Sequence, residues 1–166
     1  MLGTLFGRAR PVFFVGLAIL SISAPCAEMP VVPYTVCEIV HALPLFEGKA
    51  VAVIGRYSFR QDGISLAEQS CESKDALPPS LWLAEDTKDG PKPPDNFELD
   101  GAVLGQKLAD IRKRTSLGKF RFGSSDYDRW AVVYGRIEPR TREAAKRVPA
   151  DLVFRGDGVV VFVTPN

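Results

Sequence analysis

The sequence contains very little histidine, and it lacks the short fingerprints of several common enzyme families. His41 is the only histidine among the 166 residues, so a metal site built on two histidines is excluded. The nucleophile elbow GxSxG, the phosphate-binding P-loop and the dinucleotide-binding glycine motif are absent as well. His41 lies shortly before Pro44, at the expected end of a helix, which favours a cap or surface role over a catalytic one.

The chain also lacks a clear excess of charge of either sign. Its 21 basic and 20 acidic side chains give a net charge of +1, and without residues 1–27 it would carry 19 basic and 20 acidic ones. Proteins that bind nucleic acid through its phosphates normally carry a basic excess. The charge therefore disfavours nucleic acid as a partner.

The two signs are nevertheless separated along the chain. Residues 28–100 carry 6 basic and 13 acidic side chains, whereas residues 101–166 carry 13 basic and 7 acidic ones. In the simpler interpretation the two halves pack together and neutralise each other. Alternatively, the basic side chains form a face that attracts an anionic polymer or a membrane surface. That face would consist of Arg112, Lys113, Arg114, Lys119, Arg140, Arg142, Lys146 and Arg147.

Long hydrophobic runs are scarce, and the clearest one, Val12 to Ile22, lies near the beginning of the chain. Two arginines precede it and small residues follow it, which is typical of a signal peptide, and it is too short to span a membrane comfortably. We therefore expect residues 1–27 to be a signal peptide and the mature protein to be periplasmic or secreted, with no transmembrane segment. An uncleaved anchor is an alternative, and lipidation at Cys26 is disfavoured by the preceding Pro25.

Cysteine is scarce too, and Cys37 and Cys71 are the two that remain after export. Two cysteines in an oxidising compartment are candidates for a disulfide. A bridge that closes a loop of about 35 residues would stabilise the fold by roughly 4 kcal/mol in the chain-entropy description. A pair of buried free thiols is the alternative.

The clearest structural signal is a β-strand pattern from Gly48 to Phe59 (GKAVAVIGRYSF), which is echoed from Trp130 to Pro139 (WAVVYGRIEP). Apolar residues alternate along the first stretch, so that one face would carry Val51, Val53, Tyr57 and Phe59. Gly55 lies on that same face, and a glycine within a strand often marks a bend. The two stretches therefore predict two strands of a small, strongly curved sheet.

The other elements are expected from their boundary residues. Thr35 and Glu38 have the spacing of a capping box at the start of a short helix, which Pro44 would end. Asp100 is a suitable N-cap for a helix that continues to Arg114. Around them we expect a linker (28–34), strands at 64–71, 81–83, 130–137 and 159–164, a charged loop at 85–96 and one basic helical turn at 141–147.

The order of helix, three strands, helix and two strands resembles the OB-fold, a five-stranded Greek-key barrel with a helix between its third and fourth strands. We therefore expect a mainly β protein in which residues 35–166 form a single OB-like barrel domain with a short N-terminal helix. The stretch Thr35 to Ile39 (TVCEI), followed by Gly48-Lys49 and a Val-x-Val-x-Gly strand, is also similar to uncharacterised exported bacterial proteins with OB-like domains.

This resemblance implies a binding surface across the second and third strands, where aromatic side chains stack on bases or sugars and arginines contact phosphates. Trp82 is the strongest candidate, because Leu81 and Leu83 would point to the opposite face of the strand. In the alternative interpretation the tyrosines pack in or around the core, and the arginines lie on a solvated strand edge. The candidate ligand-binding residues are Trp82, Tyr57, Tyr134, Arg56 and Arg136.

The sequence thus favours an exported, non-enzymatic binding or structural module of the cell envelope, with a partner protein or small polymer as ligand and no cofactor. Two alternatives stay open: a domain that binds single-stranded nucleic acid or oligosaccharide, and an enzyme that uses carboxylates of the 85–100 loop. The acidic stretch Glu85 to Gly90 does not match a calcium-binding loop, because Thr87 and Asn96 stand where stronger ligands are needed.

Overall fold

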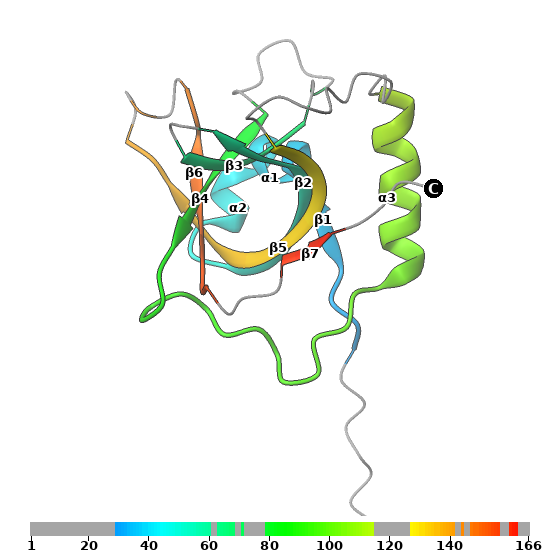
Figure 1. Ribbon diagram of the computed structural model, residues 1–166, viewed down its shortest axis with the longest axis horizontal. Coiled ribbons are helices and arrows are strands. Elements are labelled where there is room, and N and C mark those ends of the chain that lie inside the picture. Colours follow the sequence, from blue (N-terminus) through cyan, green and yellow to red (C-terminus); the bar gives the residue numbers. More distant parts are fainter. Residues whose placement is uncertain are drawn as a thin grey trace, which may run out of the picture.

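The computed structural model describes residues 29–60, 63–68, 71, 79–114, 127–141, 144, 147–156 and 160–162. Within these ranges the chain forms a barrel of strands with a long helix at its side (Figure 1). The strands are β1 (Pro33–Thr35), β2 (Ala50–Arg60), β3 (Gly63–Ala67), β4 (Ser80–Glu85), β5 (Tyr127–Pro139), β6 (Ala150–Phe154) and β7 (Val160–Phe162). The helices are α1 (Val36–His41), α2 (Leu43–Phe46) and α3 (Gly101–Arg114).

Five strands close into a barrel in the order β2-β3-β4-β6-β5, and β5 returns to β2. Neighbouring strands are antiparallel except β4 and β6, which run parallel. The closing ladder between β2 and β5 is the longest, extending from Ala50↔Arg136 to Phe59↔Tyr127. This strand order, with α3 between β4 and β5, is that of an OB-like Greek-key barrel, so the expected fold class is confirmed.

Two short strands extend the sheet beyond the barrel. β1 pairs in parallel with Ala52 to Ile54 of β2, next to the part of β2 that pairs with β3. β7 pairs with Ala131 to Val133 of β5, ahead of the part of β5 that pairs with β6. At this level the strands therefore lie side by side in the order β1-β2-β5-β7.

The barrel interior is filled by apolar side chains that alternate along its strands, and α1 adds three more. Figure 1 shows α1 and α2 within the outline of the ring of strands, and the packing of Val36 against strand residues agrees with that placement. Burial of this cluster provides most of the hydrophobic stabilisation of the barrel. Its buried members are Val36, Ile39, Val40, Val53, Leu66, Leu81, Leu83, Val133, Ile137, Ala150, Leu152 and Phe154.

A second apolar cluster lies on the outer face of β2 and β5, where α3 covers it. Ala52, Ile54, Trp130 and Val132 alternate with the inner residues of their strands, and Ile111 of α3 packs on them. Figure 1 shows α3 beside the barrel rather than inside it. Both faces of β2 and β5 are therefore buried here, which explains the continuous apolar runs at 50–54 and 130–134 in these two strands.

Helix α1 begins as expected. The hydroxyl of Thr35 accepts the backbone N–H of Glu38 at 3.1 Å, and the carboxylate of Glu38 accepts the N–H of Thr35 at 2.7 Å, so the capping box is confirmed. The helix ends at His41, before Pro44 is reached. Pro44 instead lies in the first turn of α2, where its missing N–H costs no hydrogen bond.

Four segments differ from the expectation. Pro33 and Tyr34, expected in a linker, belong to β1, and the strand expected to reach Cys71 ends at Ala67. The fifth barrel strand is β6, which the sequence did not indicate, because Asp151 interrupts a short apolar run there. The C-terminal apolar run does form a strand, but it is β7, outside the barrel. Residues 1–27, expected to be a signal peptide, and part of the turn expected at 141–147 lie outside the described residues.

Gly55, which was expected to mark a bend, and Gly135 of β5 both lie where the chain packs closely. A Cβ at Gly55 would lie 2.9 Å from Cγ2 of Val36, and a Cβ at Gly135 would lie 2.6 Å from the carbonyl oxygen of Val153. Neither glycine has a positive φ. Gly55 thus lets α1 approach β2, and Gly135 lets β6 approach β5.

Candidate binding face

Trp82 lies on the outer surface of the barrel, in the middle of β4. Its neighbours Leu81 and Leu83 are buried in the interior, so the alternation of the strand turns the indole outward. In the sheet register Trp82 is paired with Ser65 of β3 on one side and with Asp151 of β6 on the other, and Asp151 is paired with Glu138 of β5. These residues form a row across four strands.

Two close neighbours fix the position of the Trp82 ring. A Cβ at Gly63 would lie 2.1 Å from Cζ2 of the indole, so the ring rests directly on the backbone of β3. The guanidinium of Arg140 lies over the same ring, 5.5 Å from its centroid, at cation–π distance. The indole is therefore held in one orientation by its neighbours and is only partly exposed.

Arg140 is itself positioned by Asp151. Its Nε donates to Oδ1 of Asp151 at 2.7 Å, and its Nη2 lies 2.6 Å from the same oxygen. Both side chains are about three-quarters buried, with 27% and 26% exposed, which strengthens the ion pair relative to a fully solvated one. We call the surface formed by Ser65, Trp82, Glu138, Arg140 and Asp151 the Trp82 face.

Arg136 points outward from β5 but is engaged with the protein. Its Nε and Nη2 donate to Oε1 of Glu138 at 2.9 and 2.7 Å, and its Nη1 donates to the carbonyl oxygen of Asp89 at 3.0 Å. Arg136 therefore attaches the 86–90 loop to the barrel. It lies next to the Trp82 face through its contact with Glu138.

The other candidates from the sequence lie elsewhere. Tyr57 packs against the interior cluster, and Tyr134 packs against the outer cluster, edge-on to Phe97 with ring centroids 5.5 Å apart. Arg56 is paired with Trp130 on the outer side of β2 and interacts within the protein. The structure thus brings Trp82 and Arg136 near one surface and separates them from Tyr57. A ligand contact of any of the five stays a prediction.

Sequence reasoning did not assign Asp151 or Gly63 to the binding surface, and it treated Arg140 only as part of a basic face. A lone acidic residue in the apolar stretch Ala150 to Phe154 was the available signal for Asp151, since a charge at an alternating position points outward. Of the residues of the expected basic face, the side chains of Lys113, Arg140 and Arg147 are described. Lys113 pairs with Asp110 at 3.4 Å, so it and Arg140 are both neutralised by carboxylates.

Asp86, the first aspartate of the acidic loop after β4, accepts hydrogen bonds from the backbone of that loop. Oδ1 of Asp86 accepts the backbone N–H groups of Asp89 and Lys88 at 3.0 and 2.9 Å, and these hydrogen bonds lower the pKa of this exposed carboxyl. Within the described ranges, no group of three or more His, Cys, Asp and Glu side chains is arranged to hold a metal ion.

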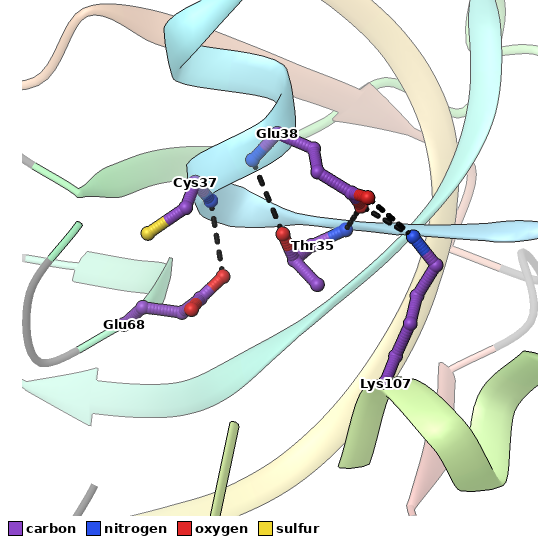
Figure 2. Close-up of polar contacts among 5 residues, drawn as sticks. All are labelled: Thr35, Cys37, Glu38, Glu68 and Lys107. Atoms are coloured by element: carbon purple, nitrogen blue, oxygen red, sulfur yellow. Dashed lines mark hydrogen bonds and ion pairs between the residues drawn. The ribbon is translucent and has the colours of Figure 1, made fainter. Parts of the chain in front are cut away.

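A second polar cluster surrounds the start of α1 (Figure 2). The expected disulfide between Cys37 and Cys71 lies beside it and is confirmed. The backbone N–H of Cys37 donates to Oε1 of the buried Glu68 at 3.0 Å. On the other side of the helix, Nζ of Lys107 from α3 contacts both carboxylate oxygens of Glu38, at 2.6 and 2.5 Å. This cluster joins α1 to β3 and to α3.

The carboxyl of Glu38 has a lowered pKa. Partial burial by itself would raise the pKa, but the hydrogen bonds from Lys107 and from the backbone of Thr35, with the positive charge of Lys107, outweigh it. The ammonium of Lys107 also lies 5.7 Å from the ring centroid of Tyr34. These contacts connect α1 and β1 to α3 within the protein. The Trp82 face is therefore the stronger binding candidate.

No helix in the described part of the chain is long and apolar enough to cross a membrane. No family model, curated protein or solved structure matches the chain.

Proposed function

We propose that this protein is an exported, non-catalytic binding module of the cell envelope, and that the Trp82 face is its ligand-binding surface. The observation that carries the proposal is the position of Trp82. The indole is on the outside of a closed barrel, with the backbone of Gly63 against its ring and the guanidinium of Arg140 over it, so its place does not depend on core packing. An ordered, partly exposed aromatic ring among convergent polar groups is typical of a binding site.

Export is supported by the sequence before Glu28 and by the disulfide, because intramolecular disulfides persist mainly in oxidising compartments. We expect the full chain, expressed in a bacterial host, to be recovered outside the cytoplasm without its first 27 or so residues. Mass spectrometry of the fractionated protein measures both properties. A Leu17→Arg variant, which interrupts the hydrophobic run, is the control and should stay in the cytoplasm at full length. Wild-type protein that does the same would contradict export.

Binding is tested by retention of envelope components on the immobilised mature domain. Wild type is compared with Trp82→Ala and with Leu45→Ala, which removes an exposed apolar side chain, 67% accessible, from α2. We expect the same component to be retained by wild type and Leu45→Ala and to be lost with Trp82→Ala. Circular dichroism should show both variants folded. If retention is equal for all three proteins, the Trp82 face is not the binding surface.

A further inference from the structure

We infer that a second binding site lies between α3 and the outer face of β2 and β5, where it takes an acyl chain and donates a hydrogen bond from Trp130 to an oxygen at the head of that chain. This site is separate from the Trp82 face and does not depend on the proposed function. One observation carries the inference. Trp130 is only 3% exposed, and its Nε1 has no hydrogen-bond partner in the part of the chain that the structure describes.

The indole N–H of Trp130 is a donor and can only be satisfied by an acceptor. A buried indole normally finds one, because a buried donor without a partner has lost its hydrogen bonds to water and gained nothing in return. A phenylalanine at this position would fill most of the same apolar space without that cost. A tryptophan here therefore favours a bound ligand that supplies the acceptor.

The side chains around Trp130 determine what the rest of the ligand must be. Trp130 shares the outer cluster with Ile54 and Val132 of the sheet and with Ile111 of α3, each of which is at most 1% exposed. A polar ligand would lose its hydrogen bonds to water in such surroundings, whereas a hydrocarbon chain has none to lose. An acyl chain combines a hydrocarbon body with an acceptor oxygen at one end, and it occurs both in free fatty acids and in membrane lipids.

The layer between α3 and the sheet is closed less tightly than the interior of the barrel. Among the described side chains of α3, Ile111 alone is buried. The pairing of β2 with β5 does not involve α3, so a small outward shift of the helix would admit one narrow chain while the barrel stays closed. The other apolar side chains of this layer are all only partly buried: Val31, Phe97, Leu99, Leu104, Leu108 and Tyr134.

The test is calorimetry of the purified protein with laurate, with lauroyl lysophosphatidylcholine and with dodecyltrimethylammonium, each below the concentration at which it forms micelles. The first two have an acceptor oxygen at the head of the chain, and the third has a chain of similar length without one. We expect laurate, the lysolipid or both to bind, and the cationic detergent to bind at least about tenfold more weakly. The tighter of the two acceptor ligands identifies the source as a free acid or a membrane lipid.

Two tryptophan variants locate the bound chain. Trp130→Phe keeps an aromatic ring in the outer cluster and removes the N–H, so it should weaken acyl binding about tenfold. Trp82→Phe is the matched control, because it makes the same substitution away from this site, and it should bind the acyl ligand as wild type does. Trp82→Phe also leaves Trp130 as the only tryptophan, so its fluorescence should change saturably as the ligand is added. Circular dichroism should show both variants folded.

The inference is overturned if neither acceptor ligand binds, if all three ligands bind equally, or if Trp130→Phe binds as tightly as wild type. Loss of acyl binding in Trp82→Phe would also overturn it, because the chain would then lie on the Trp82 face, and that result would support the proposed function. If Trp130→Phe does not fold, the comparison of head groups and the fluorescence of Trp82→Phe decide the question by themselves.

Discussion

Removal of the Cys37–Cys71 disulfide should cost this protein a large part of its stability. The bridge joins residues 34 positions apart and ties the first turn of α1 to the chain beyond β3. In the chain-entropy description, a closed loop of this length restricts the unfolded chain enough to contribute about 4 kcal/mol. For a domain of this size, that loss lowers the melting temperature by roughly 10–15 °C.

The assay is urea and thermal unfolding of a Cys37→Ser, Cys71→Ser double variant, followed by circular dichroism. Cys37 is 7% exposed, so the serine hydroxyl adds a small cost of its own through burial. Reduced wild type contains no new hydroxyl and is therefore the control, and it should unfold close to the double variant. If oxidised wild type and reduced wild type differ by less than about 1 kcal/mol, the loop-closure reasoning does not hold for this protein.

Three further changes test contacts around α1, each measured by urea unfolding. Glu38→Gln should destabilise the protein by about 1 kcal/mol at neutral pH, because it weakens the capping box and the contact with Lys107. The pKa of Glu38 is lowered in the folded state, so the charged carboxylate stabilises the fold above its ordinary pKa of 4.5, and this stabilisation is lost as the pH falls through the folded pKa. The difference in unfolding free energy between wild type and Glu38→Gln should therefore disappear in acid. A difference that persists there contradicts the assignment. Glu68→Ala should cost about 1–3 kcal/mol because it leaves the buried N–H of Cys37 without its acceptor, whereas Glu68→Gln keeps an oxygen there and should cost less; equal losses would refute this. Gly55→Ala should cost about 1–3 kcal/mol, since its Cβ would lie 2.9 Å from a side chain of α1, and an unchanged midpoint would show that α1 can shift freely.

Local signals predicted much of the fold. The boundaries of α3 and the capping side chain were correct, because Oδ1 of Asp100 accepts the N–H groups of Ala102 and Val103 at 3.0 Å each, as its N-cap position suggests. The alternation in β2 predicted that Val51, Val53 and Tyr57 face the interior, whereas Phe59, expected on the same face, is 52% exposed. The cysteine pair predicted the disulfide. Each of these features is determined within a few residues of sequence or by a single pairing.

The elements that were missed depend on distant partners. β6 follows Pro149 and contains Asp151, so its sequence has weak strand character; it is a strand because it lies parallel to β4 and antiparallel to β5. β1 is only three residues long and begins with a proline, and it exists because β2 offers it an edge. The same holds for the binding surface. The proximity of Trp82, Arg140 and Asp151 is created by the barrel closure, which no local pattern records.

The long ladder between β2 and β5 separates the two apolar clusters and contributes one face to each. Residues such as Val53 and Val133 face the barrel, while Ile54 and Val132 face α3, and all four are completely buried. Exposing either cluster to solvent would expose one face of this ladder. The backbone amides of β2 and β5 should therefore exchange with solvent only when the whole protein unfolds. Deuterium should therefore enter this central pair of strands last of all, and at one common rate on both.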